Sequence, residues 1–172
     1  MFTYQTGKDG AEILGYDEEI LARIPAGILD SFCGVGNPFS LGEIQPGESI
    51  LDIGSGAGFD LIVARSKTGP EGRVCGVDLT PEMIARARSN FAELAIADIE
   101  TLQVDSEQLP FADETFDLII SNGVINLSPE KGLLFQEMYR VLKTGGRVQI
   151  ADMVLEKELP PGMAGNLDAW AQ

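Results

Sequence analysis

Residues 49–60, with the sequence Ser-Ile-Leu-Asp-Ile-Gly-Ser-Gly-Ala-Gly-Phe-Asp, constrain the fold more than any other stretch of the chain. A short apolar run ends at Asp52, glycines follow at every second position, and an apolar stretch typical of a helix begins at Phe59. Glycine lets a backbone turn tightly and approach a ligand closely, and a helix start offers free N–H groups. This stretch therefore predicts a strand, a turn and a helix that form a nucleotide-sized site in an α/β sheet.

The three glycines of this turn, Gly54, Gly56 and Gly58, do not match the dinucleotide fingerprint G-x-G-x-x-G. The third glycine of that fingerprint would stand at position 59, where this chain has phenylalanine. A three-glycine turn alone also fits a plain strand-to-helix connection without a ligand, so the surrounding sequence has to decide.

The composition excludes several classes of function. With 12 basic and 27 acidic residues the chain carries a net charge of −15, which opposes binding to the phosphates of DNA or RNA. The chain has no histidine, which excludes Ser-His and Cys-His catalysis. The two cysteines, Cys33 and Cys75, lack metal-ligand spacing, so we expect no metal site. No apolar run reaches the length of a membrane span, so we expect a cytoplasmic protein without membrane contact.

Alternating strand and helix patterns follow the glycine turn. We predict strands at 49–53, 73–77, 99–104, 116–120 and 147–151, with helices over 58–67, from 81 onward and from 129 onward. Thr80 and Pro81 have the residue types of a helix start, and Gly145 with Gly146 is expected to end the last helix. Strands joined by helical crossovers predict an α/β fold with a Rossmann-like, doubly wound and mainly parallel sheet of about five strands.

Polar residues stand where the predicted strands end: Asp52, Asp78, Asp105 with Ser106, and Asn122. Parallel strands end on one rim of the sheet, and ligands of such folds bind beyond this rim. A single aspartate after a strand is often only a turn former. Asp78, however, follows Gly58 by 20 residues, the spacing at which an acid that binds ribose hydroxyls is expected. The convergence predicts a ligand site rather than a plain turn.

Four motifs in this order resemble those of class I S-adenosylmethionine-dependent methyltransferases; they lie at 51–58, 76–78, 105–111 and 142–146. Within that superfamily the chain is most similar to arsenite methyltransferases and their relatives, through 14–25, 34–38, 58–60, 78–83 and 121–129. The resemblance implies a methyltransferase that uses S-adenosylmethionine as its cofactor. It further implies transfer of the methyl group to a small-molecule acceptor by in-line displacement.

The resemblance also implies which residues bind the cofactor. The glycine turn, with Gly54, Ser55, Gly56 and Gly58, would hold the methionine part. Asp52 would support this turn and the cofactor ammonium group, and Asn122 would lie near the transferable methyl group. At the adenosine end the implied residues are Asp78 for the ribose, Leu79 and Met83 for the faces of the adenine, and Asp105, Ser106 and Glu107 for its polar edge.

Two positions depart from the arsenite methyltransferases, which are expected to carry cysteines there. This chain has Val35 in the 34–38 loop and Gly123 after the Ser-Asn pair. Cys33, two residues from the first position, and Asn37 in the same loop remain the candidate substrate residues. We assign no catalytic residue, because methyl transfer to a thiolate or an arsenic lone pair depends mainly on positioning.

The ends of the chain raise two further expectations. Residues 1–45 carry short helical patterns, one of them capped by Asp17, and we predict that they form a helical lid packed on a methyltransferase core of residues 46–172. Class I methyltransferases usually have seven strands, so five strands predict a C-terminally truncated core with an exposed sheet edge. We expect a homodimer or a partner chain to cover this edge.

Two other functions stay open at this point. The chain could be a non-catalytic S-adenosylmethionine-binding module or fragment, which the missing terminal strands favour. It could also be an NAD-dependent oxidoreductase, which would retain Asp78 but needs a phosphate-spanning loop that Phe59 disfavours. The ligand preference between S-adenosylhomocysteine and NAD separates a methyltransferase from the second alternative.

Overall fold

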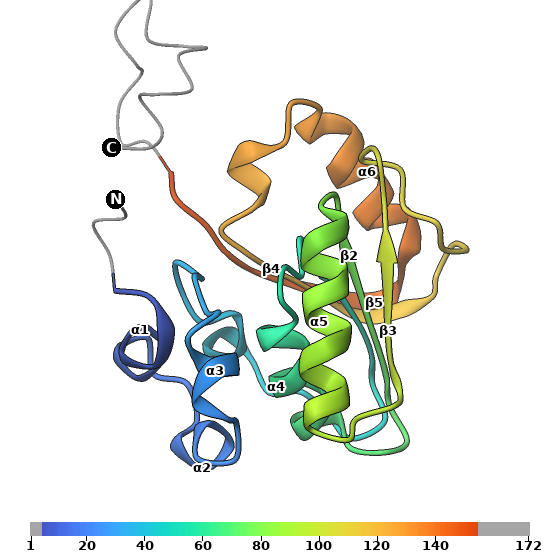
Figure 1. Cartoon of the computed structure of the whole chain (residues 1–172). Helices are drawn as coiled ribbons and strands as arrows, with labels where there is room; N and C mark the ends of the chain where they lie inside the picture. Colours follow the sequence, from blue (N-terminus) through green and yellow to red (C-terminus); the bar gives the residue numbers. More distant parts are fainter. Residues whose placement is uncertain (1–4, 155–172) are drawn as a thin grey trace, which may run out of the picture.

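The computed structural model describes residues 5–154 of the chain, which form several short N-terminal helical segments followed by a sheet with helices on its faces (Figure 1). The elements, in chain order, are α1 (Gly7–Ile13), α2 (Glu18–Leu21), α3 (Ala26–Leu29), the 3-10 turn η1 (Pro38–Leu41), β1 (Ser49–Ile53), α4 (Phe59–Thr68), β2 (Arg73–Asp78), α5 (Pro81–Glu93), β3 (Ile99–Gln103), β4 (Phe116–Asn122), the 3-10 turn η2 (Ile125–Leu127), α6 (Lys131–Val141) and β5 (Leu142–Ala151).

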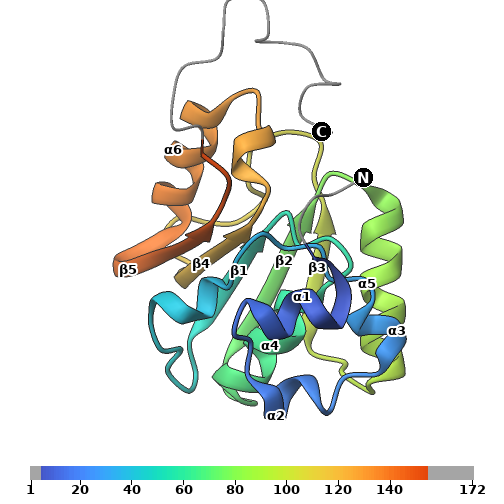
Figure 2. The same cartoon turned by 90° about the vertical axis from the view of Figure 1, so that its left-hand side faces the viewer.

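The strands form one parallel sheet in the order β3-β2-β1-β4-β5, with β1 at its centre (Figure 2). Asp52 of β1 lies beside Gly76 of β2 on one side and beside Ile120 of β4 on the other. From β1 the chain first forms β2 and β3 on one side and then crosses to β4 and β5 on the other side of β1. This reversal places the switch point of the sheet at the carboxyl end of β1. The predicted Rossmann-like α/β fold is confirmed.

Each face of the sheet buries its own apolar cluster. On one face, helices α4 and α5 and the N-terminal helices cover Ile50 of β1; on the other, α6 and the loop after β3 cover Leu51 (Figure 1). Successive side chains of a strand point to opposite faces, so neighbouring residues of β1 belong to different clusters. Because both faces are covered, the strands β1, β2 and β4 are buried over most of their length, as expected for a parallel sheet.

The N-terminal segment shares the first of these clusters with the sheet. The buried ring of Tyr16 lies edge-on to Phe32, Phe39 and Phe59, with centroids 5.2, 6.0 and 5.3 Å away. The carboxylate of Asp17 accepts hydrogen bonds at the start of α2, as predicted for a cap. Helix α1 was not predicted, because its seven residues contain no apolar repeat long enough to indicate a helix. The division into a lid and a core remains a prediction.

The end of α6 differs from the prediction. The helix stops at Val141 rather than at Gly145, and β5 begins at once with Leu142, which lies beside Phe116 of β4. The next residues of β4 and β5 resume pairing only at Leu118 and Arg147. The intervening residues therefore bulge out of the ladder, and Gly145, with φ of 82°, supplies the bend rather than a helix end.

Two smaller expectations concern the rest of the chain. Thr80 precedes α5 as predicted, but its side chain makes no capping hydrogen bond. The predicted absence of terminal strands falls on residues 155–172, which lie outside the described residues. Within residues 5–154, no helix is long and apolar enough to cross a membrane.

Candidate cofactor-binding site

The glycine turn is fixed to the carboxyl end of β2. The N–H groups of Gly54 and Ser55 both donate to the carbonyl oxygen of Val77, at 2.9 and 3.0 Å. Gly54, Gly56 and Gly58 have φ values of 73°, 51° and 84°, a region that glycine enters without strain. A Cβ atom on Gly54 would also lie 2.4 Å from a methyl group of Val124, in the loop after β4. The turn therefore requires glycine for its conformation and, at Gly54, for space.

Asp78 joins this turn to the start of α5. One oxygen of its carboxylate accepts from Gly56 N–H and the other from Thr80 N–H, both at 2.8 Å. A carboxylate has about four acceptor sites, so two backbone donors leave capacity for the hydroxyl groups of a ligand. Two backbone N–H groups therefore hold the carboxylate in place and leave it lone pairs for further donors.

Next to Asp78 lies a pocket of about 280 Å³ whose walls are mostly apolar. Leu79 and Leu127 line it although they are 61% and 65% exposed. Large apolar side chains exposed beside a fixed carboxylate suit a ligand with one flat apolar part and one polar part. Met83, 37% exposed, is on the first turn of α5 but is not part of the pocket wall.

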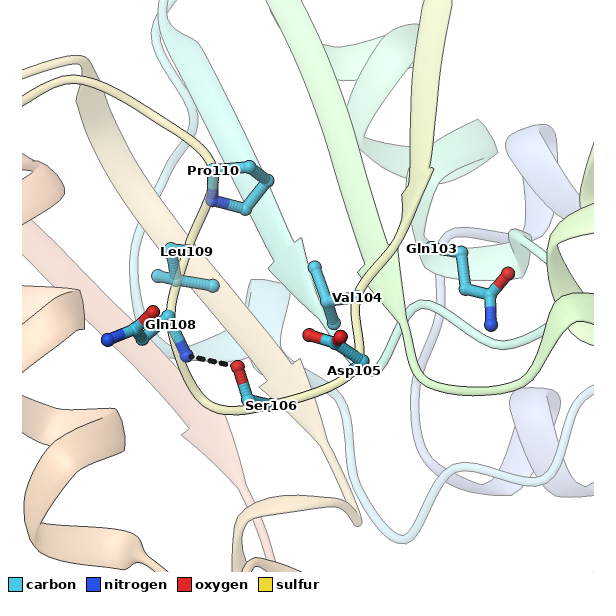
Figure 3. A pocket seen from close by; sticks show the side chains of 7 residues that line it. All are labelled: Gln103, Val104, Asp105, Ser106, Gln108, Leu109 and Pro110. Carbon is cyan, nitrogen blue, oxygen red and sulfur yellow. Dashed lines mark hydrogen bonds between the residues drawn. The ribbon is translucent and has the colours of Figure 1, made fainter.

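The loop after β3 divides the predicted adenine-binding residues between two hollows. Ser106 and Glu107 line the pocket of Asp78, and Glu107 accepts a 2.7 Å hydrogen bond from Ser128, which holds the pKa of its carboxyl below the usual range. Asp105 does not line that pocket but a neighbouring hollow of about 550 Å³, which shares Ser106 with it; its side chain points into the curve of the loop, and Gln103 points away (Figure 3).

The methionine end of the predicted site contains a buried carboxylate pair. Asp52 is 2% exposed and Asp60 is 8% exposed. Burial raises the pKa of Asp52 well above its usual value, and the charges of Asp60 and Asp78 raise it further. Burial also raises the pKa of Asp60, to about 6, against the opposing effect of hydrogen bonds from Tyr16 and Asn122. The centre of the rim therefore favours a cation or a proton.

Asn122 lies at the end of β4, as predicted, and its amide group connects the sheet to the N-terminal segment. Its oxygen accepts from the N–H groups of Val35 and Gly36, at 2.9 and 3.2 Å. Its nitrogen donates to Asp60 at 3.1 Å and contacts Tyr16, which donates to Asp60 at 2.7 Å. Tyr16 and Asp60 were missed from the sequence, because neither stands at the end of a strand.

The remaining predicted residues lie apart from this pocket. Ser55 is buried, and its hydroxyl oxygen lies under the turn, where a Cβ atom on Gly76 would be 2.7 Å away. Asn37 donates to the carbonyl of Gly15 and caps η1, and it lines a different hollow. Cys33 as a whole residue is exposed. Partial desolvation of its thiol, together with the charge of Asp60, nevertheless raises the pKa of that thiol. The substrate roles of Asn37 and Cys33 remain predictions.

Val35 and Gly123, the positions where cysteines were expected, are neighbours in space. A Cβ atom on Gly123 would lie 3.3 Å from a methyl group of Val35. The contact here is apolar. Among the described residues, no group of three or more acidic or cysteine side chains could hold a metal ion.

Comparison with known proteins agrees with the geometry of the rim. A methyltransferase domain family matches residues 44–172, which include the glycine turn, Asp78 and Asn122. The chain belongs to this family. The methyltransferase resemblance drawn from the four motifs is thereby confirmed at the level of the family.

Individual methyltransferases give the same result. The chain is 46% identical, over 91% of its length, to an arsenite methyltransferase of Halobacterium salinarum, and 30% identical, over 91%, to that of Mus musculus. It covers 40% and 44% of these two proteins, less than half of each. A crystal structure of an arsenic(III) S-adenosylmethionine methyltransferase from Chlamydomonas reinhardtii superposes with a TM-score of 0.73 at 35% identity, covering 83% of this chain and 50% of that one.

Proposed function

We propose that this chain binds S-adenosylmethionine at the carboxyl ends of β1 and β2 and transfers its methyl group to a small-molecule acceptor. The observation that carries the proposal is the carboxylate of Asp78, which backbone N–H groups of Gly56 and Thr80 hold at the mouth of an apolar pocket. A ribose diol on Asp78 would direct an adenine ring toward Leu79 in this pocket. The other end of the ligand would then extend along the glycine turn toward Asp52 and Asn122.

The charge of the rim supports a sulfonium cofactor in particular. S-adenosylmethionine carries a positive charge on sulfur, and this charge disappears when the methyl group leaves. The buried carboxyl groups of Asp52 and Asp60 favour a nearby cation, so the site would bind the cofactor more tightly than the neutral-sulfur product. The chain's own contribution would be positioning and exclusion of water around the methyl group.

The acceptor is a separate part of the proposal. Trivalent arsenic binds thiolates, and the apolar contact between Val35 and Gly123 supplies none. We therefore propose an acceptor other than arsenite. The test is a transfer assay with S-adenosylmethionine labelled on its methyl group, in which thiols, amines, phenols and arsenite are offered in parallel. Label on any of the first three classes would support the proposal, and label on arsenite alone would contradict it.

A non-catalytic binding module is the second candidate. The described residues account for cofactor binding without a catalytic group, and the chain spans less than half the length of the two arsenite methyltransferases that it matches. Binding of S-adenosylmethionine without transfer, in this chain and in a version extended at its C-terminus, would select this alternative. An NAD-dependent oxidoreductase is not proposed, because Phe59 stands where the dinucleotide turn needs glycine.

We also propose that a second copy of the chain or a partner covers β5. This strand is at the edge of the described sheet, and Val148 on it is 41% exposed. Light scattering would test this, with a monomer at all concentrations as the contradicting result. A cytoplasmic location completes the proposal, supported by a chain with only two cysteines and thus no disulfide framework.

A further inference from the structure

Asp60 is the centre of a buried hydrogen-bond network that none of the predicted cofactor contacts requires. It lies on the first turn of α4, directly after the glycine turn, and is 8% exposed. One carboxylate oxygen accepts from the Tyr16 hydroxyl at 2.7 Å and the other from the Asn122 amide nitrogen at 3.1 Å. A carboxylate can only accept hydrogen bonds, so both partners must present a donor to it.

This requirement fixes the orientation of the Asn122 amide. Its nitrogen points to Asp60 and to the carbonyl oxygen of Gly36, 2.9 Å away. Its oxygen therefore points to the N–H groups of Val35 and Gly36. A flipped amide would place the oxygen against two acceptors and the nitrogen against two donors. Asp60 thus determines, through Asn122, how the backbone of residues 34–36 is held.

Residues 34–36 are fitted closely to the ends of β4 and β5. A Cβ atom on Gly34 would lie 2.2 Å from the Asn122 amide nitrogen, and one on Gly36 would lie 2.6 Å from the side chain of Ala151. Neither contact leaves room for a side chain. Ser121, which precedes Asn122, lies beside Ile53 of β1, the residue before the glycine turn. The segment is therefore anchored one strand away from that turn.

We propose that Asp60 is a positioning residue that, through Tyr16 and Asn122, holds residues 34–36 in place as one wall of the site at the methionine end of the cofactor. This inference rests on the proposed function for the identity of the ligand. The arrangement of the wall is a property of the ligand-free protein and can be tested without a ligand.

The first test measures amide hydrogen exchange of the ligand-free protein. Tyr16→Phe removes one donor and keeps the ring, and Asp60→Asn places a donor amide against Tyr16 or Asn122. Both variants should speed exchange of the Val35 and Gly36 N–H groups by about tenfold or more, because each loses a hydrogen bond to a charged group and the free energy of such a bond corresponds to a factor of this size. Exchange in β1 and β4 should not change. Tyr139→Phe, at a position 84% exposed on α6, is the matched control.

The second test adds the ligand. In the wild type, S-adenosylhomocysteine should slow exchange at Val35 and Gly36, and both variants should bind it about tenfold more weakly while the control binds normally. Uniformly faster exchange across the sheet would overturn the positioning role, because it would indicate a general loss of stability. Local exchange with unchanged affinity would overturn the link to the cofactor. If the wild type binds no S-adenosylhomocysteine, the proposed function fails, and the first test still decides the network.

Discussion

Replacing Asp60 by asparagine should abolish a loss of stability that the wild type undergoes as the pH rises from 4 to 8. Burial raises the pKa of Asp60 to about 6, from 3.8 in an exposed carboxyl. Between these two values the folded protein binds more protons than the unfolded chain, so stability falls as the pH rises through this window. The displacement of the pKa corresponds to about 3 kcal/mol, at about 1.4 kcal/mol for each pH unit.

The prediction is therefore a difference between two pH values. The quantity to measure is the stability of the variant minus that of the wild type. This difference should be about 3 kcal/mol more favourable to the variant at pH 8 than at pH 4, where Asp60 of the folded protein is largely protonated. The titratable groups that face Asp60 are Asp52, Tyr16 and Cys33, and all three have raised pKa values and stay in the variant. Urea denaturation at half-unit steps of pH measures the difference.

Asp117→Asn provides a control of opposite sign. Burial alone would raise the pKa of Asp117, but hydrogen bonds from Lys143 and from the N–H of Ser49 hold it below its usual value. The stability that this carboxylate contributes is present above its usual pKa of 3.8 and is lost as the pH falls below it, so the disadvantage of Asp117→Asn at pH 5 should shrink toward pH 2. Parallel curves of stability against pH for the wild type and Asp60→Asn would refute this prediction, because they would mean that ionised Asp60 does not destabilise the folded protein.

Three further predictions concern folding. Gly54→Ala should destabilise the protein by about 1–3 kcal/mol in thermal unfolding, because of its positive φ and the contact of a Cβ atom with Val124. Gly132→Ala, on the open surface of α6, should be neutral or stabilising by up to about 1 kcal/mol, and a loss equal to that of Gly54→Ala would contradict both predictions. Hydrogen bonds from Arg140 lower the pKa of Glu137 to about 2, so Glu137→Gln should cost about 1 kcal/mol of stability at pH 7 in urea denaturation. The variant should also lose less stability than the wild type as the pH falls below 4.5. The same loss in both proteins would contradict this prediction.

The sequence predicted the parts of this structure that depend on local pattern. The strand that contains Asp52, the glycine turn after it and the place of Asp78 at the carboxyl end of β2 follow from residue type and spacing along the chain. The end of α6 was not predicted, because Leu142 suits a helix and a strand equally well. Its pairing with Phe116 in the sheet decided between them.

Contacts between distant segments were beyond the sequence. Tyr16 and Asp60 are 44 residues apart, and neither belongs to a motif whose chemistry requires the other. Their importance comes from their burial against each other, which residue type and spacing do not reveal. In the same way, the loop after β3 gave a run of candidate residues, and only the fold separates Asp105 from the pocket that Ser106 and Glu107 line.

Calorimetric titration with S-adenosylhomocysteine tests the central claim most directly. We expect the wild type to bind one ligand and Asp78→Ala to lose most of that affinity while keeping the fold. Asp98→Ala should bind normally, because this 59% exposed carboxylate precedes β3, at the end of the sheet opposite the rim. Equal affinity in the wild type and Asp78→Ala, or binding of NAD in preference to S-adenosylhomocysteine, would contradict the claim.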